Sequence, residues 1–221
     1  VALRDEGNEK VVVTNKGEYR AKAVILATGS ANRKLGVEDE DKLVGRGVSY
    51  CATCDGNFYR KKTVAVVGGG NTALEDALYL ADLCQKVYLI HRRDSFRGDD
   101  TNAERLKARE NVEIVYNANV TKLIAEKKLK AIEVTDKNTG DVRTIELNGL
   151  FVAVGRVPEN NNFANLIDLD SSGYAASGED CHTRTSGVFV AGDNRAKTLR
   201  QLVTATADGA MAATEAAKFV N

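Results

Sequence analysis

A glycine-rich turn between two apolar, strand-like runs is the feature that most constrains the fold of this chain. Residues 63–67 are predicted to form a strand, and Gly68-Gly69-Gly70-Asn71-Thr72-Ala73 follows directly. The spacing of apolar residues then predicts an amphipathic helix over about residues 72–83 and a second strand over residues 86–90. Strand, turn, helix and strand in this order make a βαβ unit. The sequence therefore predicts a Rossmann-like α/β fold for this part of the chain.

The turn has the spacing Gly68-x-Gly70-x-x-Ala73, which is typical of dinucleotide sites when it follows a strand and begins a helix. Gly68 permits the tight turn, Gly70 lets a pyrophosphate approach the backbone, and Ala73 keeps the helix close to the sheet. Asn71 and Thr72 lie where the predicted helix starts, and the free N–H groups and positive dipole end of a helix N-terminus favour phosphate. A glycine turn with a purely structural role is the alternative interpretation.

The segment after the second strand indicates which dinucleotide binds. An NAD site usually has an acidic residue there, whereas this chain has His91-Arg92-Arg93-Asp94-Ser95-Phe96-Arg97. Guanidinium groups match a ribose 2′-phosphate in both charge and geometry. His91, Arg92, Arg93 and Arg97 therefore predict NADPH as the ligand. The alternatives are a solvated basic turn and, for His91, a role in packing.

A pair of cysteines precedes the glycine turn, in the sequence Cys51-Ala52-Thr53-Cys54-Asp55-Gly56. A CxxC motif can close into a small disulfide ring, and it often lowers the pKa of one thiol so that a thiolate is present at neutral pH. The spacing also begins many zinc sites, but the chain has no second CxxC, and Cys181-His182 lies far along the sequence. We therefore predict a redox dithiol at Cys51 and Cys54, and no metal.

Composition excludes several other classes of function. The 221 residues can form one or two domains, and 31 Lys and Arg balance 31 Asp and Glu, so no overall charge favours nucleic acid or an anionic membrane. No apolar run approaches the roughly 18 residues of a membrane span, and the N-terminus shows no signal-peptide pattern. Four cysteines, two of them in the CxxC, fit a reducing compartment. We therefore expect a soluble, cytoplasmic protein.

The remaining segments predict mostly short strands. Two extended runs flank Asn15-Lys16-Gly17, and a third strand ends near Thr28. Further strands are expected over residues 112–115, 120–125, 130–135, 143–146, 150–154 and 188–191, with helices over residues 102–109 and 201–219. The four strands between residues 120 and 154 are joined by turns, which predicts an antiparallel insertion in the nucleotide domain. Residues 30–46 and 159–162 have the composition of linkers.

The motifs CATCDG, VVGGGNTA and HRRDSFR, in this order, resemble those of bacterial-type, low-molecular-weight thioredoxin reductases. Four later or flanking segments agree with this resemblance, which covers nearly the whole chain: Ala27-Thr28-Gly29, Gly155-Arg156-Val157-Pro158, Gly192-Asp193 and Leu199-Arg200-Gln201.

The resemblance implies a three-layer, Rossmann-like NADPH domain inserted in an FAD domain, with a homodimer as the assembly. It predicts FAD-domain segments at residues 1–34 and 161–221 and the NADPH domain at residues 35–160. Members of the family begin with a flavin-binding βαβ unit, and nothing before Lys10 can supply one. We therefore expect the FAD domain to lack its N-terminal part. The two linkers would let the NADPH domain rotate.

In proteins similar to this one, NADPH reduces FAD, FAD reduces the CxxC disulfide, and the dithiol reduces thioredoxin. By resemblance, Cys54 is the thiol next to the flavin, Cys51 exchanges with the partner, and Asp55 supplies and accepts the proton, unless it only forms an Asp-Gly turn. The resemblance places the flavin against Thr28, Gly29, Gly192, Asp193, Arg200 and Gln201. For Asp193 and Gln201, the plain alternatives are a strand-end acid and a helix cap.

Three other functions remain open from the sequence. A related flavoprotein disulfide reductase, of the alkyl hydroperoxide reductase type, would prefer NADH, which the arginines disfavour. A flavin-free NADPH-binding module could act as a redox sensor. A zinc-stabilised interaction domain would bind metal and no pyridine nucleotide.

Overall fold

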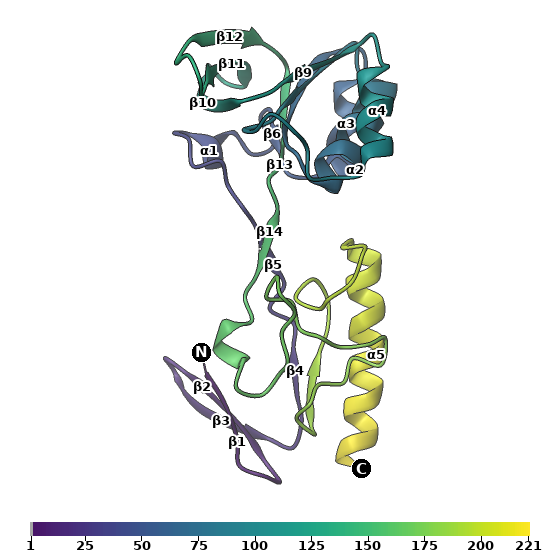
Figure 1. The fold of residues 1–221 in the computed structure, drawn as a ribbon. Helices are drawn as coiled ribbons and strands as arrows, with labels where there is room; N and C mark the ends of the chain where they lie inside the picture. Colours follow the sequence, from purple (N-terminus) through teal and green to yellow (C-terminus); the bar gives the residue numbers. More distant parts are fainter. Residues whose placement is uncertain (1) are drawn as a thin grey trace. The chain divides into compact units, whose positions relative to one another are not determined.

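The computed structural model describes residues 2–221 (Figure 1). The chain divides into two compact units, one formed by residues up to Ala31 together with Arg156–Asn221, and the other by Asn32–Gly155. Each unit is described by itself below.

A five-stranded parallel sheet forms the centre of the unit Asn32–Gly155. Its strands, in spatial order, are β6 (Val48–Ser49), β13 (Gly149–Ala153), β7 (Thr63–Gly68), β8 (Lys86–Ile90) and β9 (Val112–Val115). Alternate residues of β7 enter different cores: Val64 and Val66 pack in one cluster, and Ala65 and Val67 in another. Because both faces of this strand are covered, its sequence is a continuous apolar run.

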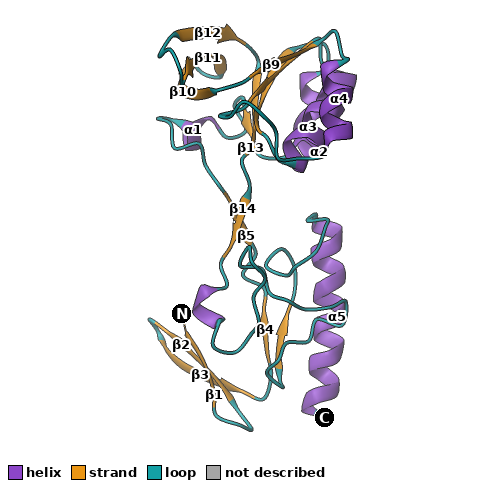
Figure 2. Cartoon of the chain, in the orientation of Figure 1, coloured by secondary structure: helices purple, strands orange, loops and turns teal. Residues whose placement is uncertain are grey.

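Two different layers cover the two faces of this sheet (Figure 2). Helices α3 (Asn71–Leu83) and α4 (Asp100–Lys107) pack on one face, together with the short α2 (Ala52–Asp55). An antiparallel sheet of β10 (Ala118–Ala125), β11 (Leu129–Asp136) and β12 (Val142–Glu146) packs on the other. The expected three-layer, Rossmann-like fold is confirmed.

Some expected elements differ from the structure. The strand expected at residues 150–154 as part of the antiparallel insertion is β13, which pairs in parallel with β7 and β6. Its run Leu150-Phe151-Val152 is buried throughout, so it belongs to the central sheet. The stretch 30–46, expected as a linker, contains β5 (Ser30–Asn32), which pairs with β14 (Arg156–Pro158), and the short helix α1 (Glu40–Leu43). Backbone pairing forms ordered strands there despite the polar composition.

The other unit contains two small sheets and a long helix in addition to the β5–β14 pair (Figure 1). Strands β1 (Ala2–Asp5), β2 (Lys10–Thr14) and β3 (Gly17–Ala21) form an antiparallel sheet. Strands β4 (Val24–Leu26) and β15 (Val188–Val190) pair in parallel, and α5 (Leu202–Val220) packs against this pair. Two short 3-10 helices, η1 (Gly56–Tyr59) in the first unit and η2 (Asn161–Phe163) in this one, complete the elements.

A buried ion cluster ties α5 to the loop after β15. The Asp208 side chain is 6% exposed and accepts hydrogen bonds from Gly192 N (2.9 Å), Arg195 Nη2 (2.8 Å) and Lys197 Nζ (2.8 Å). Burial alone would raise the pKa of this carboxyl, but the bonds from Arg195, Lys197 and Gly192 outweigh it and hold the pKa well below its usual range. The cluster therefore stabilises the folded unit with Asp208 ionised.

Replacement of Asp208 tests this cluster. Asp208→Asn should lower the free energy of unfolding by about 2–4 kcal/mol at neutral pH, because two buried cations lose their carboxylate. Since the folded pKa lies below the unfolded value, the contribution is complete at neutral pH and is lost as the pH falls through the folded pKa. The difference from wild type should therefore shrink towards about pH 3. Urea unfolding followed by circular dichroism measures both effects.

The exposed pair Asp168 and Arg184, 2.9 Å apart, gives the matched control. Asp168→Asn should change the free energy of unfolding by no more than about 0.5 kcal/mol at either pH, because solvent screens this ion pair. Equal losses in the two variants would show that the buried cluster contributes nothing of its own.

Candidate functional site

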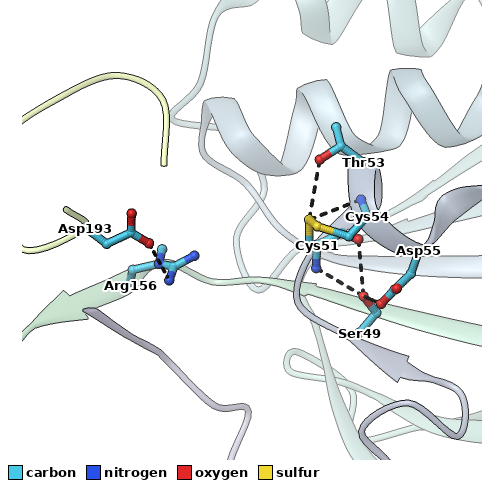
Figure 3. Close-up of a disulfide and its surroundings, with 7 residues drawn as sticks. All are labelled: Ser49, Cys51, Thr53, Cys54, Asp55, Arg156 and Asp193. Atoms are coloured by element: carbon cyan, nitrogen blue, oxygen red, sulfur yellow. Dashed lines mark hydrogen bonds and ion pairs between the residues drawn. A yellow bond between two sulfur atoms is a disulfide. The ribbon is translucent and has the colours of Figure 1, made fainter. Parts of the chain in front are cut away.

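Cys51 and Cys54 form a disulfide at the start of α2 (Figure 3). Strand β6 ends at Ser49, and Cys51 then caps α2, with its sulfur accepting a hydrogen bond from Cys54 N at 3.2 Å. The Thr53 hydroxyl lies 3.4 Å from the same sulfur. A disulfide sulfur carries no hydrogen, so the hydroxyl is the donor. Two donors thus converge on the Cys51 sulfur.

The Asp55 carboxylate lies next to this disulfide loop. The Ser49 hydroxyl lies 2.7 Å from Asp55 Oδ2 and accepts a hydrogen bond from Cys51 N at 3.1 Å (Figure 3). Asp55 is half-buried, whereas Ser49 is 4% exposed. Asp55 ends α2 and Gly56 begins the next helical turn, so Asp55 is placed by a specific side-chain contact at the end of a helix.

A cavity of about 520 Å³ lies beside Asp55 in the same unit. Its lining includes Phe58 and Tyr59 from η1, together with Arg46, Lys62 and Lys128. The Phe58 side chain is 73% exposed, although it belongs to a strongly apolar residue type. Phe58 is therefore an exposed apolar side chain at the edge of a cavity that Asp55 also lines.

The glycine turn has the close packing that its motif predicts. A side chain at Gly68 would collide with the carbonyl oxygen of Ala153 and the methyl group of Ala73. A side chain at Gly70 would instead project into open space, with nothing within 4 Å. The backbone at Gly70 is therefore open to a ligand, and α3 begins directly after it with unpaired N–H groups.

His91 lies beneath the middle glycine of this turn. Its imidazole is 5% exposed and occupies the place where a side chain at Gly69 would lie. Its Nε2 is 2.9 Å from the Ser95 carbonyl oxygen, and burial lowers the pKa of the ring. The sequence left packing open as an alternative for His91, and the structure shows that the ring is packed. Its contact with a cofactor stays a prediction.

The loop that follows β8, residues 91–98, carries the three arginines and is called the arginine loop below. Backbone hydrogen bonds hold it against the glycine turn. The N–H groups of Arg97 and Gly98 donate to the Gly69 carbonyl oxygen at 2.8 and 3.2 Å, and Asp99 N donates to Asn71 Oδ1 at 2.7 Å. Arg92, Arg93 and Arg97 are exposed, and the ion pairs formed within residues 2–221 do not include them. Guanidinium groups available to a ligand therefore lie on a loop held against the glycine turn. Thr72 is also exposed there, in the first turn of α3.

The residues expected at the flavin come together in the other unit. Thr28 and Gly29 follow β4, and Gly192 and Asp193 follow β15. Because these strands are parallel, the segments that follow them leave the same edge of the sheet. Asp193 Oδ2 lies 3.2 Å from Arg156, whereas the buried Oδ1 has no hydrogen-bond partner in the described part of the chain (Figure 3). A buried, unbonded carboxylate oxygen fits a ligand that carries hydroxyl groups, such as the ribityl chain of FAD.

Arg200 and Gln201 lie at the start of α5. The Arg200 guanidinium is 3.8 Å from the centre of the Tyr174 ring, and its Nε donates to the Asp193 carbonyl oxygen. Gln201 caps α5 in a reciprocal arrangement with Thr204. The helix-cap alternative for Gln201 is thus present in the structure, and its contact with the flavin stays a prediction.

Sequence reasoning missed three residues of these sites. Ser49 and Tyr174 belong to no recognisable motif, and Arg156 stood in a matched segment without a stated contact. The sequence offers one signal for Ser49, which is its position two residues before Cys51. It offers none for the contacts of Arg156 and Tyr174, because their partners lie far away in the sequence.

The other thiols are separate from the disulfide. Cys84 and Cys181 are both buried and unpaired, and burial raises the pKa of each thiol. Among residues 2–221, no group of three or more His, Cys, Asp and Glu side chains has the geometry of a metal site. Over the same residues, no helix is long and apolar enough to cross a membrane.

Comparisons with known proteins agree with this arrangement. The family model for pyridine nucleotide-disulphide oxidoreductases matches residues 2–209. A protein of Peptoclostridium acidaminophilum named thioredoxin reductase is 41% identical over 221 residues, covering 97% of this chain and 70% of that protein. One of Bacillus subtilis with the same name is 40% identical over 217 residues, covering 97% of this chain and 69% of that protein.

Solved structures give the same result. Thioredoxin reductase from Streptococcus pyogenes has a TM-score of 0.92 and 35% identity, covering 99% of this chain and 72% of that one. The enzyme from Giardia duodenalis has a TM-score of 0.89 and 30% identity, covering 99% of this chain and 73% of that one. The CxxC disulfide, the glycine turn and the length of the matches lead to one conclusion. The chain belongs to the thioredoxin reductase family of pyridine nucleotide-disulphide oxidoreductases.

Proposed function

We propose that this chain is an NADPH-dependent flavoprotein disulfide reductase that reduces thioredoxin through the Cys51–Cys54 disulfide. The observation that carries this proposal is a CxxC disulfide in the same compact unit as a glycine turn with an unpaired arginine loop. Disulfide chemistry needs a two-electron donor, and a reduced nicotinamide supplies a pair of electrons as hydride. The family, the fold and the dithiol all support this function.

Binding of NADPH would use the turn and the loop together. Gly70 would leave the backbone at the start of α3 open to the pyrophosphate, while Gly68 and Ala73 allow α3 to pack closely against the sheet. The 2′-phosphate would pair with Arg92, Arg93 and Arg97, while the buried His91 keeps the loop under the turn.

FAD, when bound, supplies a carrier that accepts hydride from a nicotinamide and passes two electrons to a disulfide. Asp193 would hold its ribityl hydroxyls through the unbonded Oδ1, with Thr28, Gly29 and Gly192 forming the backbone around it. Arg200, stacked on Tyr174, would place a positive charge beside the bound group. Gln201 is the N-cap of α5, so the positive end of that helix dipole would be directed to the same place.

The dithiol would act through Cys51. Once the disulfide is reduced, the Thr53 hydroxyl and Cys54 N remain as donors to the Cys51 sulfur and favour its thiolate. This thiolate attacks a disulfide of the partner, Cys54 then displaces the partner's sulfur, and the Cys51–Cys54 bond forms again. Asp55 gives a proton to the sulfur that leaves and takes one from the thiol that attacks.

The partner would dock beside Asp55, where Phe58 is exposed at the edge of the cavity. Thioredoxin as that partner, a homodimer as the assembly, and the cytoplasm as the location form part of the same proposal. They are supported by the family to which the chain belongs.

Cysteine variants test the direction of transfer. Cys54→Ser leaves the Cys51 thiolate without its resolving thiol, so incubation with oxidised thioredoxin should give a mixed disulfide. Non-reducing electrophoresis and mass spectrometry should find it at Cys51. The matched variant Cys51→Ser should give at least about tenfold less of this adduct. Equal adducts at both positions would contradict Cys51 as the exchanging thiol, and no adduct in either variant would contradict thioredoxin as the partner.

Arginine variants test the choice of dinucleotide. Arg92→Ala combined with Arg93→Ala should weaken NADPH binding about 10- to 100-fold, because charge-assisted bonds to the 2′-phosphate are lost. The affinity for NADH should stay within about twofold of wild type, since NADH has no such phosphate. Isothermal titration calorimetry measures both constants.

Arg60 provides the control for this experiment, because it is also exposed in the unit Asn32–Gly155 but lies outside the loop. Arg60→Ala should bind both nucleotides as wild type does. A wild-type chain that binds NADH more tightly than NADPH would favour the related reductase of the alkyl hydroperoxide type.

A further inference from the structure

Ser49 lies between the acid and the disulfide. Its hydroxyl oxygen is 2.7 Å from Asp55 Oδ2, 3.1 Å from Cys51 N and 3.3 Å from the Cys51 carbonyl oxygen (Figure 3). A serine hydroxyl has one hydrogen, and the carboxylate is both the closer and the stronger acceptor. The hydroxyl therefore donates to Asp55 and accepts from Cys51 N.

The backbone of Ser49 is held by the central sheet. Ser49 is the last residue of β6, paired in parallel with Phe151 of β13, and only 4% exposed. Phe151 is itself buried in the core beneath α3. A hydroxyl on this strand is thus a rigid point from which a mobile side chain can be oriented.

The Ser49 hydroxyl orients the Asp55 carboxylate. Within residues 2–221, Ser49 is the one side chain that bonds the Asp55 carboxylate. The backbone of Asp55 is joined to Cys51 as well, because Asp55 N donates to the Cys51 carbonyl oxygen at 3.1 Å. Ser49, Cys51 and Asp55 therefore form a closed set of contacts around the disulfide loop.

We propose that Ser49 is a positioning residue for the dithiol, whose hydroxyl holds the Asp55 carboxyl where it exchanges a proton with the sulfurs of the Cys51–Cys54 pair. Nothing in the family motif assigns this serine a role. The inference rests on the proton-transfer role proposed for Asp55, and it predicts that Ser49 acts only through Asp55.

Reduction of the Cys51–Cys54 disulfide by dithiothreitol includes the same proton transfer and needs no flavin. A thiolate of dithiothreitol attacks one sulfur of the disulfide, the Cys51–Cys54 bond breaks, and the leaving sulfur takes a proton from the Asp55 carboxyl. The second thiolate of dithiothreitol attacks the mixed disulfide and releases the other protein sulfur, which also takes up a proton. The chain gains two electrons and two protons, dithiothreitol becomes a cyclic disulfide, and Asp55 recovers its proton from water.

A double-mutant cycle tests the proposal on the full chain. The rate of reduction by dithiothreitol is followed by quenched-flow alkylation and mass spectrometry. Asp55→Ala should slow reduction about tenfold and Ser49→Ala about fivefold. The double variant should be within about twofold of Asp55→Ala, because residues that act as one unit are not additive. Ser49→Thr keeps the hydroxyl and should restore the rate to within about twofold of wild type.

Thr53→Val is the matched control, since it removes a hydroxyl that contacts Cys51 Sγ but not Asp55. Its effect should multiply with that of Asp55→Ala. If the effects of Ser49→Ala and Asp55→Ala also multiply, or if Ser49→Thr is as slow as Ser49→Ala, the positioning role is overturned. If Asp55→Ala reduces at the wild-type rate, the proposed acid role itself fails, which is a different result.

A second measurement needs no change at Ser49. In Asp55→Ala the Ser49 hydroxyl loses its acceptor and is no longer held towards Cys51 N. Hydrogen exchange at the Cys51 amide should then rise by at least about fivefold over wild type, while the Phe151 amide stays protected. Unchanged exchange at Cys51 would overturn the proposal even if Ser49→Ala did not fold.

Discussion

The close approach of α3 to the parallel sheet is the contact on which the glycine turn, the proposed nucleotide site, depends. Strand β7 lies between β13 and β8, so Ala153, Gly68 and His91 reach the same edge of the sheet at the ends of three neighbouring strands. A side chain at Gly68 would push the helix away from Ala153, and one at Gly69 would displace His91. With the helix displaced, the backbone at Gly70 would no longer be open. The hydrogen bonds that join the arginine loop to Gly69 and Asn71 would also be lost.

The same sheet also carries the dithiol. Strand β6 pairs with β13 on the side away from β7 and ends at Ser49, which is bonded to both Asp55 and Cys51. The turn after the disulfide fits against α3, since a side chain at Gly56 would collide with Tyr79. Both reactive parts of this unit are therefore supported by one hydrophobic core, which includes Ala52, Ala73 and Phe151. A rigid support suits chemistry that needs hydrogen-bond donors at fixed positions.

Charge is balanced over the whole chain but not within its sites. Buried Asp208 has two cations and a backbone N–H as partners, which leaves the loop after β15 firmly held. Asp193 on that loop keeps one buried oxygen without a partner, and the arginines after β8 have no carboxylate among the described residues. Groups left unpaired in an otherwise satisfied structure are the natural places for ligands, because binding removes the cost of leaving them unbonded.

Local patterns in the sequence were enough to predict several parts of the structure. The glycine spacing, the apolar run of β7 and the period of α3 predicted the βαβ unit, and the CxxC predicted the disulfide, because each signal lies within a few adjacent residues. The sequence did not place β13, because a short apolar run looks the same in an antiparallel insertion and in a parallel sheet. The contacts between distant segments, such as Arg156 with Asp193 and Arg200 with Tyr174, became visible in the folded chain alone. These contacts, like the bond from Ser49 to Asp55, depend on how strands and helices pack, and packing leaves no fixed spacing in the sequence.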